Sequence, residues 1–367
     1  MPSLNTVVRC LKWLKRHSMW VRWAVALSLL ATLYFLHRNE LSELIDKQPN
    51  LYYFSLAGLL FLASITLTFF RWYLLVWAQN FPFRLRDALR LGFIGYACNY
   101  VMLGAVGGDI FKAGMIAKQQ RSRRWVAAGT VLLDRLIGLL ALFMVGAMAS
   151  LLLDRSMLED SSVRAVVAVL WGGSVAGLVG LCVMLHPRVP HSRWLNWLIH
   201  VRWVGRVIDG MTNALVLYQA KRRIIVAAVG ISLIGHFGML TCFYLCAQAL
   251  HLGAAAPDYW GNLVFIPGAE LASVLVPMPG GVGVLEGAVQ ISYGIANAAA
   301  GSPVAAESAR AAGLFTALGM RVISVLIAAA GAGYYIAMRK EIGEALDEST
   351  NSDEDDLKPE DVAQQTK

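Results

Sequence analysis

Long apolar blocks dominate this sequence and restrict the folds that the chain can adopt. Of its 367 residues, 57% are hydrophobic and 15% are charged, against about 25% charged in an average soluble domain. A helix that spans a bilayer needs about 20 mainly apolar residues, and the apolar residues here form blocks of that order rather than amphipathic stripes. The sequence therefore predicts an all-α polytopic membrane protein with six full transmembrane helices, at residues 19–36, 51–78, 126–153, 163–185, 224–250 and 311–338.

Two further apolar regions, residues 89–117 and 259–299, are each interrupted near the middle. The first interruption reads Gly-Ala-Val-Gly-Gly-Asp at 104–109, and the second reads Pro-Met-Pro-Gly-Gly-Val-Gly at 277–283. Because glycine and proline disfavour helix interiors, each region is predicted to form two half-helices joined by a break.

Basic residues indicate how these regions sit in the membrane, because the cytoplasmic loops of membrane proteins are rich in Lys and Arg. If both interrupted regions are re-entrant hairpins, the inside segments carry 21 Lys and Arg residues and the outside loops carry 3. If residues 89–117 crossed fully, two large basic clusters would move outside. We therefore expect a multi-pass protein of the bacterial inner membrane with both termini in the cytoplasm.

In this topology one hairpin enters from the cytoplasm and the other from the opposite face, as in an inverted repeat. Interrupted segments in corresponding positions of two halves indicate a binding site at the midplane. The unpaired backbone at such breaks needs protein or water around it, because lipid cannot satisfy its polar groups. A cavity near the breaks is therefore expected.

Charge and composition divide the chain into three parts. Residues 1–18 form a basic cytoplasmic N-terminus, and His37 and Arg38 after the first block favour a membrane anchor over a cleaved signal. Residues 19–338 form the transmembrane domain, in which residues 187–223 show the spacing of an amphipathic helix that lies either on the membrane surface or against the ends of the bundle. Residues 339–367 are acidic and poor in large apolar residues, which predicts a disordered cytoplasmic tail.

Several charged residues lie inside the apolar blocks, where each costs about 2.5–3.5 kcal/mol on insertion scales and so needs a partner, water or a function. Asp134 and Arg135 are adjacent on one predicted helix and point about 100° apart, so each needs another partner. Arg321 is the predicted cationic partner of Glu270, Glu286 or Asp134, and we expect Asp134, Arg135 and Arg321 to form one buried cluster.

The break at 104–109 is followed by Asp109 and Lys112, one helical turn apart. The N–H groups at the start of a half-helix favour anions, so a lipid phosphate fits there with Lys112 as its counter-charge. Alternatively, Asp109 is simply the N-cap of the half-helix. His236 is predicted to be a hydrogen-bonded interior histidine, the aromatic residues Trp72, Tyr73 and Trp77 are predicted interfacial anchors, and Asn99, Arg71 and Gln290 are further candidates.

Other classes of site are not indicated by the sequence. The five cysteines are scattered, and Cys242 and Cys246 lack the further ligands that a tetrahedral metal site would need. The glycines of the second break lack the Lys and Ser/Thr of a P-loop. The basic residues lie in short clusters between apolar blocks, which is not typical of nucleic-acid binding. We therefore expect no metal, no cofactor and no nucleic acid.

Motifs in a fixed order connect the chain to a known family. The sequence resembles the membrane-domain family of lysylphosphatidylglycerol synthases, also called flippase-like proteins. The motifs that carry the resemblance are Asn99, Gly107-Gly108-Asp109, Asp134-Arg135, the Pro-Gly-Gly-Val-Gly-Val-Leu-Glu run at 279–286, and Arg321. In this family the multiple peptide resistance factor joins such a membrane region, which moves aminoacylated phosphatidylglycerol between leaflets, to a cytosolic aminoacyl-transferase domain.

The resemblance implies the translocating part without the synthase part, because only the acidic tail follows the last block. We expect a translocator of an anionic phospholipid or lipid-linked headgroup rather than an enzyme. A membrane-embedded transferase that acts on a polyprenyl phosphate or phospholipid, and a membrane scaffold, are the alternatives. The sequence leaves homo-oligomer formation open. The predicted substrate-binding residues are Asn99, Gly107, Gly108, Asp109, Lys112, Asp134, Arg135, Glu270, Gly280, Gly281, Gly283, Glu286 and Arg321.

Overall fold

The described part of the chain is a bundle of helices. A computed structural model describes residues 48–101, 106–120, 123–188, 205–276, 278 and 281–355, and no strand occurs among them. Five of the described helices are long and apolar enough to cross a membrane: α3 (Leu51–Ala78), α6 (Arg124–Ser150), α7 (Ser161–Leu185), α10 (Arg222–Ala249) and the Ala306–Gly331 part of α13. The predicted span at residues 19–36 lies outside the described residues.

Polar residues directly before three of the helices determine where these helices begin. The side chain of Asn50 accepts a hydrogen bond from the Tyr52 N–H at the start of α3. Asp160 caps α7 in the same way, and Asp258 caps α11 (Tyr259–Leu275) through the Gly261 N–H. Asn and Asp are preferred at this position because they satisfy N–H groups that have no partner within the helix.

The two interrupted regions form two pairs of shorter helices. The first pair is α4 (Leu85–Val101) and α5 (Gly107–Gln119), and the second is α11 and α12 (Val284–Ala299). These helices have 17, 13, 17 and 16 residues, which corresponds to about 20–26 Å each. A bilayer core is about 30 Å thick, so none of the four alone has the usual length of a transmembrane helix.

The first pair returns to the end of the bundle at which it starts. Arg123, which follows α5, donates a hydrogen bond of 3.1 Å from Nη1 to the backbone oxygen of Gln79, the residue that ends α3 and precedes α4. Lys221, which precedes α10, bonds Asn80 at the same place. We call this the basic end. The described charged residues at this end include Arg84, Arg86, Asp87, Arg90, Lys118, Arg123, Arg124, Arg188, Lys221, Arg222 and Arg223.

The second pair starts and finishes at the opposite end, which we call the acidic end. The start of α11, the end of α12 and the loop after α6 line one common cavity there. The Asn50 N–H also bonds the Ala249 oxygen at 2.8 Å, which places the start of α3 beside the end of α10. The described charged residues at this end are Asp154, Arg155, Glu159, Asp160, Arg164, Asp258, Glu307 and Arg310.

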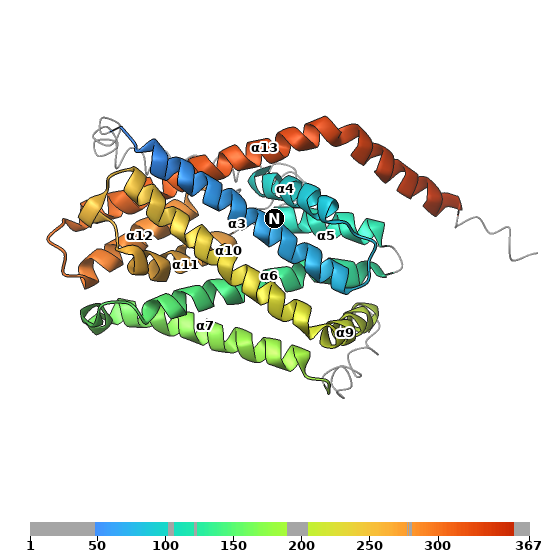
Figure 1. The fold of residues 1–367 in the computed structure, drawn as a ribbon, viewed down its shortest axis with the longest axis horizontal. Coiled ribbons are helices and arrows are strands. Elements are labelled where there is room, and N and C mark those ends of the chain that lie inside the picture. The colour runs from blue at the N-terminus through green and yellow to red at the C-terminus, as the bar shows by residue number, and fades with distance from the viewer. Residues whose placement is uncertain are drawn as a thin grey trace, which may run out of the picture.

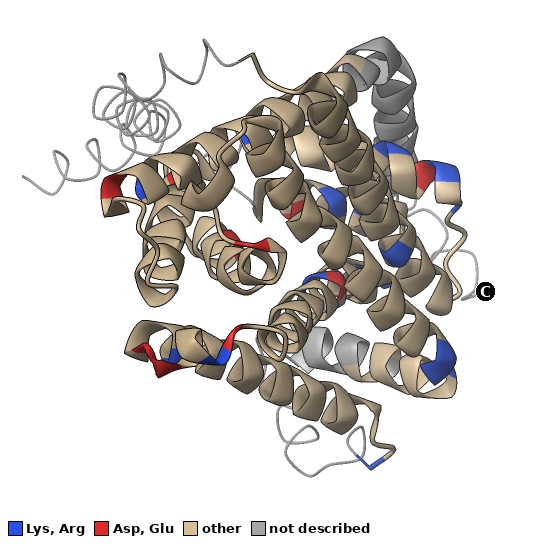
Figure 2. Ribbon diagram, turned by 60° about the vertical axis from the view of Figure 1, so that its left-hand side comes forward, with Lys and Arg blue, Asp and Glu red and all other residues tan. Residues whose placement is uncertain are grey.

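The two pairs therefore approach each other from opposite ends, between long helices that run the full length of the bundle (Figure 1). In Figure 2 most of the Lys and Arg residues lie toward one side of the bundle, and most of the Asp and Glu residues that lie outside its centre are on the other. The separation of charge that the sequence indicates is thus also a separation in space.

Helix α9 (Gly205–Ala220) covers part of the basic end and falls within the predicted amphipathic segment 187–223, of which residues 189–204 lie outside the described residues. The Tyr218 hydroxyl donates to the Leu75 oxygen at 3.0 Å, and the Gln79 side chain donates to the Ala214 oxygen at 3.1 Å. Of the two alternatives for this segment, these contacts favour packing against the ends of the bundle.

Helix α13 (Ala306–Asp355) is longer than predicted. The expected last span ends at Met338, yet the helix continues through residues 339–355, for which composition predicts disorder. This stretch begins with good helix formers such as Glu, Ala and Leu, and it extends past the bundle in Figure 1. Residues 356–367 lie outside the described residues.

One aromatic residue is placed differently from the prediction. Trp72 is completely buried in the core near the basic end, where its indole N–H donates to Thr130. The prediction of an interfacial anchor is therefore wrong for Trp72, because the side of α3 that carries it faces other helices. Trp77 is 49% exposed, and the Lys221 ammonium group lies over its ring.

Candidate functional site

Close backbone contact holds the two helices of the first hairpin together beside their break. The Gly108 N–H donates to the Asn99 side-chain oxygen at 2.7 Å, which gives a partner to one of the free N–H groups at the start of α5. A Cβ atom on Gly108 would lie 2.0 Å from the Gly95 backbone oxygen. Glycine is thus required at Gly108 because α4 and α5 touch there.

Asp109 is the acidic centre of this first site. Its carboxylate lies 2.9 Å from the Lys112 ammonium group and also bonds the Arg135 guanidinium of α6. Lys112 is buried and lies over the ring of Trp72. Arg135 differs, because 39% of its side chain is exposed. The Asp109 carboxylate is therefore shared between a buried cation and an accessible one.

The second break is shaped by glycines with positive φ angles. Gly281 has φ 64° and Gly283 has φ 81°, a region that side chains with a Cβ rarely adopt. Glu286 accepts a hydrogen bond of 2.7 Å from the Gly283 N–H at the start of α12. Its other carboxylate oxygen lies 2.7 Å from Arg321 of α13, and Glu286 is completely buried.

Arg321 links this second site to the first hairpin. Its guanidinium donates to the Gly281 backbone oxygen at 3.3 Å, and it also interacts with the Tyr100 hydroxyl of α4. Tyr96 and Tyr100 have hydroxyls 3.5 Å apart. Helix α13 therefore contacts both hairpins, and Arg321 bonds residues of each.

A third ion pair crosses the bundle between α3 and α6. The Arg71 Nε lies 2.7 Å from Asp134, both side chains are 3% exposed, and Arg71 also donates to Ser232 of α10 at 2.5 Å. The prediction that Asp134 pairs with Arg321 in one cluster with Arg135 is therefore wrong: Asp134 pairs with Arg71, Arg135 with Asp109, and Arg321 with Glu286. Which residues become partners depends on which faces of the helices pack against each other.

His236 belongs to the same network as Arg71. Its Nδ1 lies 2.9 Å from the Ser232 backbone oxygen and 3.4 Å from the Ser232 hydroxyl. Because a carbonyl oxygen can only accept, Nδ1 carries the proton. The prediction of a hydrogen-bonded interior histidine is confirmed.

Four further predicted residues lie at or near the two breaks. Glu270 lies on α11 before the second break and is half-buried, and its carboxylate is in the electrostatic field of Arg321. Gly107 starts α5 and is buried. Gly280 lies outside the described residues, and Gln290 of α12 has an interaction with another residue.

These contacts define what the site can do chemically. Asp109, Asp134 and Glu286 each form an ion pair with a Lys or Arg side chain. Within the described chain, no group of three or more His, Cys, Asp or Glu side chains could hold a metal ion. The accessible Arg135 guanidinium can instead donate two parallel hydrogen bonds to a phosphate or carboxylate.

Sequence reasoning found the charged residues but not all of their partners. Ser232 and Tyr100 cannot be recognised from the sequence, because hydroxyl residues are common in membrane helices and carry no distinctive spacing. Arg71 ranks only as a further candidate. The signal that could have raised its rank is charge balance, since Asp134 required a buried cation and Arg71 lies in an apolar block.

Comparisons with known proteins identify the family. No curated protein and no solved structure matches the chain. The family described as the lysylphosphatidylglycerol synthase TM region matches residues 19–331, which contain all three ion-pair sites and both breaks. Membership implies a multi-pass membrane protein in lipid metabolism or translocation. The chain belongs to the lysylphosphatidylglycerol synthase transmembrane-region family.

Proposed function

We propose that the protein translocates a lipid with an anionic headgroup between the leaflets of a bacterial inner membrane. In this proposal the basic end faces the cytoplasm, in agreement with the positive-inside rule. Both hairpins are then re-entrant, the first from the cytoplasmic face and the second from the opposite face. The headgroup moves past the two breaks, and the acyl chains stay in the bilayer.

The observation that carries the proposal is the accessible Arg135 guanidinium beside the first break. Arg135 lies 11 residues after Arg124, the first residue of α6, which corresponds to about 16 Å along the helix axis and so to roughly the middle of a bilayer. A charge at that depth is costly unless it is paired or hydrated. An anionic headgroup that binds Arg135 would exchange one partner of the guanidinium for another.

The local contacts keep the free-energy cost of such an exchange small. When Arg135 leaves Asp109, Lys112 still lies 2.9 Å from that carboxylate. The carboxylate therefore keeps a cation in both states. The start of α5, at Gly107 and Gly108, lies close to the same place, and the N-terminus of a helix favours an anion.

The experiment is leaflet-specific lipid labelling with the purified full chain in liposomes. Fluorescent phosphatidylglycerol in the inner leaflet should become accessible to an external quencher faster with the wild-type protein than in protein-free liposomes. Arg135→Gln should remove most of this acceleration, whereas the matched control Arg164→Gln, an exposed arginine at the acidic end, should retain it. Equal rates for Arg135→Gln and the wild type would refute the proposal.

A further inference from the structure

Exposed apolar side chains flank the ion pair between Arg135 of α6 and Asp109 of α5. Residues three or four positions apart share one face of a helix. Such a face of α6 runs beside Arg135, such a face of α5 runs beside Asp109, and the ion pair joins the two helices. We call the exposed apolar residues of these faces the lateral strip: Leu132, Leu136 and Leu139 on α6, and Val106 and Ile110 at the start of α5.

The lateral strip reaches the level of the second break. Helix α11 packs against α6 and runs in the opposite direction, and a Cβ atom on Gly146 of α6 would lie 3.1 Å from the Cγ atom of Pro267 of α11. Leu275 ends α11 eight residues after Pro267, which corresponds to about 12 Å along the helix axis. Leu275 is therefore about level with Leu139 of α6. Leu275 and Val276 are both exposed, so exposed apolar side chains lie beside both breaks.

The charge beside the strip distinguishes it from the other apolar faces of the bundle. Helices α7 and α10 also expose apolar side chains, such as Val179 and Ile234. No Asp, Glu, Lys or Arg follows Arg164 in α7 or Arg223 in α10, so these two faces offer hydrocarbon contact alone. The lateral strip combines hydrocarbon contact with an accessible guanidinium near the middle of the bilayer. A lipid with an anionic headgroup matches both features.

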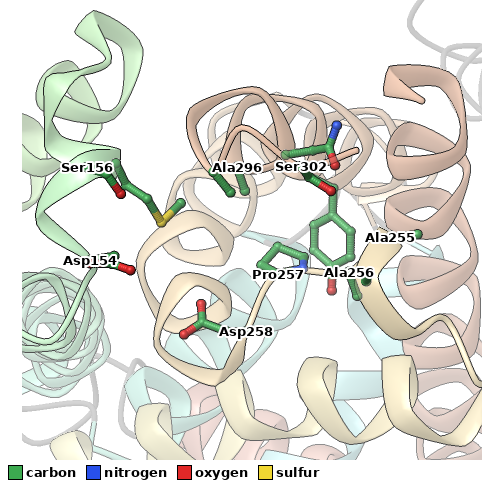
Figure 3. Close-up of a pocket in the computed structure, with 13 residues that line it drawn as sticks. Asp154, Ser156, Ala255, Ala256, Pro257, Asp258, Ala296 and Ser302 are labelled. Atoms are coloured by element: carbon green, nitrogen blue, oxygen red, sulfur yellow. The ribbon is translucent and has the colours of Figure 1, made fainter. Parts of the chain in front are cut away.

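The acidic end offers such a headgroup a less suitable entrance. A cavity of about 330 Å³ opens there between α11, α12 and the loop after α6 (Figure 3). Asp154 and Asp258 line this cavity, and no Lys or Arg occurs among its described lining residues. An anionic headgroup would therefore meet like charge in the cavity, whereas beside the lateral strip it meets a cation.

We propose that the lateral strip holds the acyl chains of a lipid whose anionic headgroup binds Arg135, so that the lipid reaches the first break from the side of the bundle. The inference rests on the proposed function and adds to it the face at which the lipid enters. The acyl chains would stay in contact with apolar side chains and with the bilayer. Only the headgroup would need polar partners from the protein, which Arg135 and the start of α5 supply.

The first measurement is photo-crosslinking of the full chain in liposomes that contain equal amounts of phosphatidylglycerol and phosphatidylcholine with identical acyl chains. Leu136→benzoylphenylalanine places a photoreactive side chain on the strip, and mass spectrometry identifies the lipids that it captures. The matched control is Ile234→benzoylphenylalanine on α10. Leu136 and Ile234 each lie 12 residues after the first residue of their helix, and they are 54% and 65% exposed.

The net charge of the lipid should decide which lipid is captured. At position 136 phosphatidylglycerol should exceed phosphatidylcholine about fivefold, the equivalent of about 1 kcal/mol, because the choline group of phosphatidylcholine neutralises its phosphate. Adding Arg135→Gln should remove this preference. At position 234 the two lipids should be captured in equal amounts.

The second measurement changes the size of the side chain on the strip. Leu136→Trp enlarges an exposed side chain beside Arg135 and should slow lipid movement in the leaflet-labelling assay several-fold. Ile234→Trp makes the same kind of change at a matched depth on α10 and should leave the rate unchanged. Thermal unfolding of both variants checks that they are folded.

The outcomes separate this inference from the proposed function. A preference for phosphatidylglycerol at position 136 that depends on Arg135 supports the strip even if the wild-type protein moves no lipid, a result that would refute translocation alone. The inference is overturned, with translocation intact, if the wild-type protein moves lipid while position 136 captures both lipids equally. A preference that persists in Arg135→Gln, or that is as large at position 234, overturns it as well.

Discussion

The two hairpins differ in how the carboxylate beside each break is paired with cations. At both breaks a carboxylate lies just after the glycines and pairs with an arginine of another helix. In the second hairpin, Glu286 is completely buried and its partner Arg321 is 11% exposed. In the first, Asp109 is 12% exposed and has two cations, one of which, Arg135, is 39% exposed. One buried ion pair holds the second break, whereas two cations share the carboxylate at the first.

This difference indicates a division of labour. A buried ion pair is strongly destabilised when one member is lost, so Glu286 and Arg321 fix the second break and attach it to α13. A carboxylate shared by two cations tolerates the departure of one. The first break is therefore the better place for a ligand to bind and leave.

The largest effect on stability is expected at the second break. Arg321→Ala leaves the Glu286 carboxylate buried without its cation, which should lower the free energy of unfolding by about 3–5 kcal/mol. Thermal unfolding in detergent measures this as a lower midpoint. A midpoint close to that of the wild type would show that the two breaks do not differ in the way described.

The pair between Arg71 and Asp134 should show strong coupling. Asp134→Leu alone leaves Arg71 buried and unpaired, whereas Asp134→Leu together with Arg71→Met should cost less than the sum of the single changes. A double-mutant cycle on unfolding midpoints measures the coupling. Combining Asp134→Leu with Arg321→Ala serves as the control, and these two losses should be closer to additive because each residue has its own partner.

An intermediate effect is expected at the contact between α4 and α5. Gly108→Ala places a Cβ atom 2.0 Å from the Gly95 oxygen and forces the two helices apart, at a cost of about 1–3 kcal/mol. Gly114→Ala on the same helix has open space around the new Cβ atom and should be neutral or stabilising by up to about 1 kcal/mol. If both variants unfold at the same temperature, the close contact does not matter to stability.

The smallest effect on stability is expected for Arg135→Gln, about 1 kcal/mol or less, because Lys112 remains with Asp109 and no charge is left without a partner. The same change should have the largest effect on lipid movement in liposomes. A strongly lowered unfolding midpoint for Arg135→Gln would erase the contrast between the two breaks and assign Arg135 a structural role.

The sequence predicts the long helices well, because length and apolarity alone decide where a chain can cross a bilayer. The predicted span 51–78 coincides with α3, and 163–185 ends where α7 ends. The breaks are equally predictable, since glycine and proline act locally. The partners of charged residues are less predictable from the sequence. Arg71 and Asp134 are 63 residues apart in sequence, and only the packing of the bundle determines which faces of α3 and α6 meet.

The same reasoning explains the error at Trp72 and the unexpected length of α13. A tryptophan near a helix end is typical of a membrane interface, but Trp72 faces the ring of helices that includes α6. The acidic composition after residue 338 predicts disorder, yet it is compatible with a helix when the residues are helix formers, as in α13. In both cases the local sequence pattern is compatible with two structures: an interfacial or a buried tryptophan, and a disordered or a helical segment.

The position of Arg71 also constrains how the protein is made. During synthesis Arg71 leaves the ribosome 63 residues ahead of Asp134, and Ser232 follows much later. Helix α3 must therefore enter the insertion machinery with an unmatched guanidinium, at a cost of about 2.5–3.5 kcal/mol. The apolar residues that make up most of α3 offset this cost. The charge of Arg71 is therefore placed in the membrane before its partner on α6 has been synthesised.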